Sequence, residues 1–218
     1  MKNLQLVIFD MDGLIFDTER LSYASWKEAA EKFNINFELS LLYKLLGTNH
    51  ENVRNALFRE FGDKINVDDY MAEKRRIFFK KIENGEVVKK PGLDELLEYL
   101  QDKNIKKAVA TSSNREVAYN LLKDANIFHY FDYILCGDEV KKSKPDPEVF
   151  LTVAKKLDVK PSECIVLEDS EAGTIAASRG RMMPIVIPDL KEPDKEIEEL
   201  AYKKLNNLKE VIDVIENL

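Results

Sequence analysis

The sequence predicts an α/β protein in which a doubly wound parallel sheet carries an inserted α-helical domain. Strand-like apolar runs alternate with helical patterns from residue 91 to residue 187, an order typical of a parallel sheet with helices on both faces. A further strand-like run, LQLVIF, stands near the start of the chain. The segment between them has helical spacing without a strand signal and is far too long for an ordinary crossover. We therefore expect a core of residues 1–15 and 90–218, and a helical cap domain of residues 16–89.

The first predicted strand runs directly into two aspartates. Asp10 and Asp12 follow the apolar run, and Gly13 marks the point where the strand breaks. In extended backbone, residues i and i+2 point to the same side, so the two carboxylates would converge on one spot. Such a pair repels, and it implies either a proton-sharing acid/base couple or a divalent metal ion.

The inserted segment is predicted to be entirely helical. Its apolar residues recur at the spacing of helix faces: Tyr23, Trp26, Ala30 and Phe33; Leu41, Leu42, Leu45 and Leu46; Val53, Leu57 and Phe61; and Met71, Phe78 and Ile82. Glycine and proline at residues 13–17 and 84–92 would let the chain leave and re-enter the core.

Beyond this insertion the elements alternate in order. The predicted helices cover residues 93–101, 116–124, 147–157 and 171–179, and the predicted strands cover residues 106–110, 133–136, 164–167 and 184–187. Ser113 with Glu116 fits a capping box, and Asp146 with Pro147 fits a capped helix start. Residues 197–218 are expected to form amphipathic helices.

Composition narrows the class of protein. A formal charge of −7 and a pI near 5.1 argue against nucleic acid or an anionic membrane as the main partner. The sequence shows no signal peptide and no apolar run of membrane-spanning length, so we expect a cytoplasmic protein, and we expect it to be a monomer. Cys136 and Cys164 lie in apolar runs, which predicts buried free thiols.

Polar residues gather where the predicted strands end. In open parallel sheets, ligands bind beyond the carboxyl ends of the strands. Besides Asp10 and Asp12, these positions hold Thr111-Ser112-Ser113 and Glu168-Asp169-Ser170, with Lys144 a short loop beyond a third strand. The set supplies a nucleophile, an acid/base, a hydroxyl and an ammonium for phosphate oxygens, and carboxylates for a hard cation.

These residues resemble the four motifs of the haloacid dehalogenase (HAD) superfamily, in the branch with a helical cap inserted after the first strand. The matching stretches are Asp10-Met11-Asp12-Gly13, Thr111-Ser112, Lys144-Pro145 and Glu168-Asp169. The opening FDMDGLIFDTERLSY is similar to that of sugar-phosphate and nucleoside-phosphate phosphatases and of beta-phosphoglucomutase-like enzymes. The resemblance covers nearly the whole chain and implies a Mg²⁺-dependent phosphatase acting on a small phosphorylated metabolite.

The resemblance also implies residue roles. Asp10 would attack phosphorus to form an aspartyl phosphate, and Asp12 would act as general acid and then general base. Thr111, Ser112 and Lys144 would bind the phosphate. Mg²⁺ would be held by Asp10, the Asp12 carbonyl and Asp169, while Glu168 would orient a metal-bound water or Lys144 without ligating the ion. In the cap, Thr48, Asn49 and His50 are candidates for substrate specificity.

Two alternatives stay open. A phosphosugar mutase of the beta-phosphoglucomutase type is weakened because such sequences carry a cap histidine near the position of Ser22 and an arginine after the cap glycine, where this chain has Gly47-Thr48-Asn49-His50. A non-catalytic phospho-accepting module also places acidic residues, a threonine and a lysine at strand ends. The size of the insertion and the spacing of Asp10 and Asp12 argue against such a module.

Overall fold

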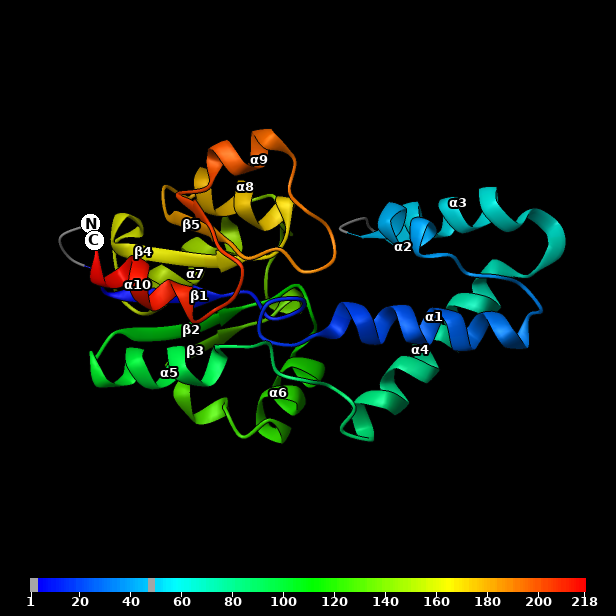
Figure 1. Ribbon diagram of the computed structural model, residues 1–218, viewed down its shortest axis with the longest axis horizontal. Coiled ribbons are helices and arrows are strands. Elements are labelled where there is room, and N and C mark those ends of the chain that lie inside the picture. The colour runs from blue at the N-terminus through cyan, green and yellow to red at the C-terminus, as the bar shows by residue number, and fades with distance from the viewer. Residues whose placement is uncertain (1–3, 47–49) are drawn as a thin grey trace. The chain divides into compact units, whose positions relative to one another are not determined.

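The computed structural model describes residues 4–46 and 50–218, and for residue 50 the backbone only (Figure 1). The chain divides into two compact units. A core unit comprises Met1–Asp17 and Val88–Leu218, and a helical unit comprises Thr18–Val87.

The core unit is built on a parallel sheet. Among the described residues, six strands lie in the order β3-β2-β1-β4-β5-β6. Their bounds are β1 Leu6–Phe9, β2 Lys106–Ala110, β3 Tyr133–Leu135, β4 Cys164–Glu168, β5 Met183–Val186 and β6 Lys203–Lys204. All neighbouring strands pair in parallel, so the predicted fold class is confirmed.

The register of the central strands positions the site. Phe9 of β1 pairs with Val109 of β2 and with Leu167 of β4. The residues that follow these three, Asp10, Ala110 and Glu168, therefore lie at the same level at the carboxyl edge of the sheet. The amide of Asp10 donates to the carbonyl of Leu167 at 2.9 Å.

Helices cover both faces of this sheet (Figure 1). Their bounds are α5 Leu93–Asp102, α6 Arg115–Asp124, α7 Glu148–Lys156, α8 Glu171–Arg179, α9 Lys195–Leu200 and α10 Glu210–Glu216, with short 3-10 turns η2 Phe128–Tyr130, η3 Gly137–Glu139 and η4 Pro161–Glu163. Alternate strand residues such as Ile8, Ala108 and Val166 pack with Phe150 of α7 and Ala176 of α8 in one buried cluster. Because strand side chains alternate, the residues between them face the other side of the sheet.

Two parts of the core unit differ from the sequence prediction. The tail is not helical throughout, because β6 pairs with β5 through hydrogen bonds from Tyr202 to Pro184 and from Leu205 to Val186. This edge strand is only two exposed lysines long, too short for an alternating pattern. The predicted cap for α7 is also wrong by one residue, since Pro147 holds the N-cap position. The Asp146 carboxylate instead accepts the N–H of Glu148 in the preceding turn.

The helical unit has an aromatic core. Its helices are α1 Thr18–Lys32, α2 Leu39–Leu45, α3 His50–Phe61 and α4 Val67–Glu83, with a 3-10 turn η1 at Gly62–Lys64. Tyr70 is fully buried, its hydroxyl donates to the carbonyl of Trp26 at 3.0 Å, and its ring meets those of Trp26, Phe33 and Phe61. Trp26 stacks on Phe37 at 5.3 Å between centroids. None of the described helices of the protein combines the length and apolar character needed to span a membrane.

The two chain segments at the boundary of the core unit run side by side. The amide of Asp17 donates to Val88, the amide of Lys90 donates to Ile15, and Phe16 forms an antiparallel bridge with Lys89. A buried ion pair fixes this crossing to the loop after β5. The Lys90 ammonium lies 2.6 Å from Oδ1 of Asp189, whose side chain is only 2% exposed. Within the part of the chain that the structure describes, Oδ2 of Asp189 has no hydrogen-bond partner.

Replacing Lys90 with methionine should destabilise the protein strongly. The substitution leaves the buried carboxylate of Asp189 without a counter-ion, and breaking a buried pair in this way costs about 3–5 kcal/mol. The measurement is the free energy of unfolding in urea, followed by circular dichroism.

The neighbouring lysine provides a matched control. Lys89 pairs with Asp94 at 2.6 Å, but the two side chains are 35% and 53% exposed. Lys89→Met should therefore cost less than about 1 kcal/mol. Equal losses for the two variants would contradict the importance assigned to the Lys90–Asp189 pair.

Candidate active site

The first loop of the site is shaped by a glycine. Gly13 has a φ of 81°, a left-handed conformation that side-chain-bearing residues rarely adopt. A Cβ at this position would lie 2.2 Å from Oδ2 of Asp169. The predicted break after β1 therefore turns the chain sharply and also lets the loop that carries Asp10 and Asp12 approach the end of β4.

Lys144 is the centre of the hydrogen-bond network. Its ammonium, on a side chain only 7% exposed, contacts Oδ1 of Asp10 and lies 2.6 Å from Oε1 of Glu168. It also donates to the carbonyl of Ala110 at 3.1 Å and lies 4.9 Å from the centroid of the Phe150 ring. One cation thus joins the carboxyl ends of β1, β2 and β4.

Burial and neighbouring charges shift the pKa values of Asp10 and Lys144. Burial raises the pKa of Asp10 to about 8, because Lys144 offsets only part of the penalty for removing the carboxylate from water. The carboxylates of Glu168 and Asp12 act in the same direction as burial. Burial by itself lowers the pKa of Lys144, but Asp10 and Glu168 together raise it above its ordinary value. Lys144 therefore stays charged between its two acidic partners, Asp10 and Glu168.

Glu168 is held on both of its oxygens. Oε1 accepts a hydrogen bond from the Lys144 ammonium, and Oε2 accepts hydrogen bonds from the amide of Ser170 at 3.1 Å and from its hydroxyl at 2.8 Å. The Ser170 hydroxyl in turn accepts the N–H of Gly173 and caps α8. A Cβ on Gly173 would lie 1.8 Å from Oε1 of Glu168, so only glycine leaves room for this fully buried carboxylate.

Asp12 is held by neutral hydroxyls rather than by a cation. Ser113 donates to its Oδ2 at 2.7 Å, and Thr111 approaches the same oxygen at 3.3 Å. Thr111 is buried, while Ser112 between them is exposed. The sequence places Ser113 at this strand end but predicts a helix cap there rather than a contact with Asp12, and that prediction is wrong. The cap of α6 is Asn114, whose side chain accepts the N–H of Val117.

The acidic residues fit a divalent metal ion. Asp10, Glu168 and Asp169 each offer a carboxylate oxygen, and these oxygens lie within 4.8 Å of one another. Carboxylates are ligands that hard divalent cations favour. Both oxygens of Glu168 already accept hydrogen bonds from Lys144 and Ser170.

A comparison with protein families identifies this arrangement. The sequence model of the haloacid dehalogenase-like hydrolase family matches residues 7–187 of the chain. This stretch includes every strand-end residue described above. The chain belongs to this family.

Similar proteins include enzymes with two activities. The chain is 33% identical over 178 residues to a phosphorylated carbohydrates phosphatase of Thermotoga maritima, with 80% of each chain covered. It is 32% identical over 190 residues to the beta-phosphoglucomutase of Bacillus subtilis, covering 84% of this chain and 82% of that one. The crystal structure of a beta-phosphoglucomutase from Clostridium difficile superposes with a TM-score of 0.76 at 26% identity, covering 98% of this chain and 96% of that one.

These findings confirm the predicted HAD-superfamily membership and the hydrolase class. HAD-family enzymes generally use a divalent metal ion, and the acidic group of Asp10, Glu168 and Asp169 is suited to one. Of the predicted specificity residues, Thr48 and Asn49 lie outside the described residues, and His50 is the first residue of α3.

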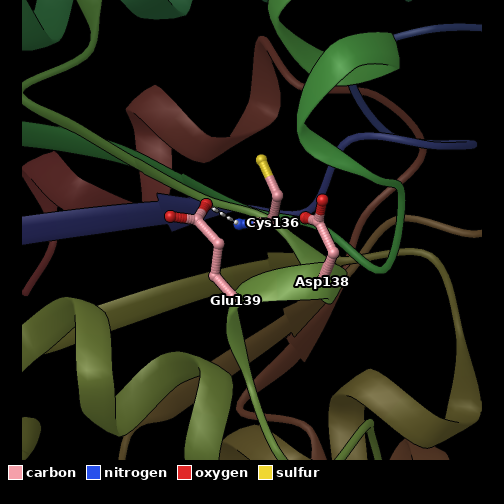
Figure 2. A group of neighbouring side chains, drawn as sticks. All are labelled: Cys136, Asp138 and Glu139. Atoms are coloured by element: carbon pink, nitrogen blue, oxygen red, sulfur yellow. Dashed lines mark hydrogen bonds between the residues drawn. The ribbon is translucent and has the colours of Figure 1, made fainter.

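A second group of potential ligands lies at the end of β3 (Figure 2). Cys136, Asp138 and Glu139 also bring ligand atoms within 4.8 Å. Figure 2 shows the Glu139 carboxylate turned back to the amide of Cys136, and the same carboxylate pairs with Arg115. Burial raises the pKa of the Cys136 thiol to about 12, which disfavours the thiolate that a metal needs. This group is therefore part of the turn at η3, and both cysteines are free and buried, as predicted.

Substituting Gly173 with alanine should disrupt this HAD-family site from within. The new methyl group must displace Glu168, and overpacking a filled core costs at least about 1–3 kcal/mol. Urea unfolding should show this loss, and kcat/KM for phosphate esters should fall with it, because Lys144 loses one of its two carboxylates. Gly180→Ala, at the other end of α8, is the control, since its nearest atoms would lie at 3.3 Å. A Gly173→Ala protein as stable and active as Gly180→Ala would contradict the packing described.

Proposed function

We propose that this HAD-family hydrolase is a Mg²⁺-dependent phosphatase that acts on small phosphorylated carbohydrates through an aspartyl phosphate on Asp10. The core unit would carry the chemistry, and the helical unit would act as the cap. The observation that supports this most is that two aspartates two residues apart lie in different surroundings. Asp10 is buried against the Lys144 ammonium, whereas the half-buried Asp12 is held by hydroxyl groups.

In the proposed reaction Asp10 is the nucleophile. Its carboxylate attacks phosphorus, and the bond from phosphorus to the leaving oxygen breaks. Asp12 gives its proton to the departing alkoxide, then takes a proton from the water that attacks the aspartyl phosphate. That second attack releases inorganic phosphate and restores both carboxyl groups to their starting states.

The surrounding residues orient the phosphate. Lys144 supplies a fixed positive charge beside Asp10, and the Thr111 hydroxyl and residue Ser112 are proposed to bind the phosphate oxygens. Lys144 is held from three sides, so little reorganisation is needed when charge develops on the substrate.

The proposed metal ligands are Asp10, Asp169 and the backbone carbonyl of Asp12. When bound, Mg²⁺ would neutralise charge on the phosphate oxygens. Glu168 is proposed to orient Lys144 rather than to ligate the ion, because its two oxygens already accept hydrogen bonds.

The substrate class is proposed from the named relatives, one of which is a phosphatase of phosphorylated carbohydrates. Specificity is proposed to depend on the cap residues Thr48, Asn49 and His50. If so, Asn49→Ala or His50→Ala should change the ranking of sugar phosphates by kcat/KM, and an equal fall for every substrate would contradict the assignment.

A phosphosugar mutase is the second candidate, favoured by the similarity to the beta-phosphoglucomutases. It is less well supported because Ser22 and His50 stand where such sequences carry a histidine and an arginine. A mutase must hold a bisphosphate at both ends, and the missing guanidinium would weaken that hold.

Purified protein should release phosphate from p-nitrophenyl phosphate and from hexose phosphates in the presence of Mg²⁺. Chelation by EDTA should abolish the activity, and Asp10→Asn should lower kcat by at least about 10³-fold because an amide is a poor nucleophile. Activity that survives both treatments would contradict the proposal.

The same assay separates the two candidate reactions. A mutase would convert β-glucose 1-phosphate to glucose 6-phosphate faster than it releases phosphate, and a sugar bisphosphate would accelerate that conversion. A phosphatase should release phosphate from both sugar phosphates without that acceleration.

A further inference from the structure

Ser113 makes the shortest hydrogen bond that Asp12 receives. Its hydroxyl lies 2.7 Å from Oδ2 of Asp12, at the upper end of the range typical of O–H···O⁻ bonds to an ionised acceptor. The Thr111 hydroxyl lies farther from the same oxygen, at 3.3 Å. Thr111 Oγ1 also accepts the N–H of Ser113 at 2.9 Å, so this hydroxyl supports the turn as well as the carboxylate.

The backbone around Ser113 is fixed on several sides. Its carbonyl accepts the N–H of Gly137 at 2.9 Å, and Asn114 next to it caps α6. A Cβ on Gly137 would lie 2.2 Å from the carbonyl oxygen of Ser112, so the turn packs closely against η3. Because Asn114 satisfies the helix start, the Ser113 hydroxyl is available to Asp12.

The two oxygens of Asp12 differ in the hydrogen bonds that they accept. Among the residues that the structure describes, both donors reach Oδ2, and no hydrogen bond to Oδ1 is present. Hydrogen bonds to one oxygen restrict the rotation of the carboxyl group, and they leave the other oxygen to exchange a proton. General acid catalysis depends on this geometry, since the proton must be within hydrogen-bond reach of the leaving oxygen.

We propose that Ser113 is a positioning residue for Asp12: it binds Oδ2 and thereby directs Oδ1 to the leaving oxygen of the substrate. The inference rests on the acid/base role of Asp12 in the proposed function. Ser113 itself exchanges no proton in the reaction. Its hydroxyl keeps its hydrogen bond while Asp12 gives a proton to the leaving group and later accepts one from water.

This role has a signature that loss of structure alone would not produce. A weakly basic leaving group such as p-nitrophenolate departs without a proton, whereas the more basic phenolate benefits from one. A misdirected Asp12 should therefore slow the hydrolysis of phenyl phosphate more than that of p-nitrophenyl phosphate. The relevant parameter is kcat/KM, which includes the departure of the leaving group and excludes hydrolysis of the aspartyl phosphate.

The test compares both aryl phosphates in Ser113→Ala, with Mg²⁺ present. We expect kcat/KM to fall about 10- to 100-fold for phenyl phosphate, part of the 10²- to 10⁴-fold that general acid catalysis contributes, and only a few-fold for p-nitrophenyl phosphate. Ser113→Thr, which keeps a hydroxyl, should restore much of the lost rate. Ser162→Ala is the matched control, since Ser162 is exposed in η4, before the first residue of β4 and so away from the carboxyl ends of the strands. It should leave both rates unchanged.

Asp12→Asn separates failure of this inference from failure of the proposed function. If Asp12→Asn slows phenyl phosphate selectively but Ser113→Ala lowers both rates equally or not at all, the role of Ser113 is wrong and that of Asp12 stands. If Asp12→Asn shows no such selectivity, the acid/base role fails, and the inference fails with it. Should Ser113→Ala not fold, as judged by circular dichroism, Ser113→Cys is compared instead. It preserves the shape with a weak donor, and the same selectivity is expected.

Discussion

The site depends on one buried cation, the Lys144 ammonium held between Asp10 and Glu168. Buried charges are tolerated only when they are paired and hydrogen-bonded, so each of these three groups requires the others. The contact with the Ala110 carbonyl adds a third strand end to the same point. Glu168 extends the dependence into α8, where Gly173 must lack a side chain for the carboxylate to fit. The position of the Asp10 carboxylate is thus determined by packing well beyond the loop that carries it.

Two aspartates from one short loop acquire different properties through their surroundings. Asp10 lies in a dry environment against an ammonium, and its raised pKa reflects burial that Lys144 does not fully offset. Asp12 is half-buried and receives hydrogen bonds from hydroxyls. Pairs of titratable groups in contrasting environments are a common basis for dividing labour between a nucleophile and an acid/base. The spacing of two residues brings the two carboxyl groups together, and contacts from the neighbouring loops give them different environments.

Much of this arrangement could be predicted from local sequence patterns. Strand ends marked by Asp10, Thr111 and Glu168 had to meet at one edge, because parallel strands share an orientation. Patterns could not reveal contacts that depend on tertiary structure. The Lys90–Asp189 pair joins residues 99 positions apart. The cap predicted at Ser113 is wrong because Ser113 and Asn114 are both good helix caps, and only the folded turn decides between them. The edge strand β6 has no periodic signal, since two exposed lysines form all of it.

In the proposed reaction Asp10 becomes covalently phosphorylated during turnover. The most direct measurement is acid quenching of the enzyme within one turnover of p-nitrophenyl phosphate, followed by peptide mass spectrometry. We expect a phosphoryl group on Asp10 that is absent from the Asp10→Asn variant. Asp12→Asn should accumulate more of it, because hydrolysis of the intermediate loses its general base. Turnover without any phosphoryl adduct, or with the adduct on a residue other than Asp10, would contradict the account.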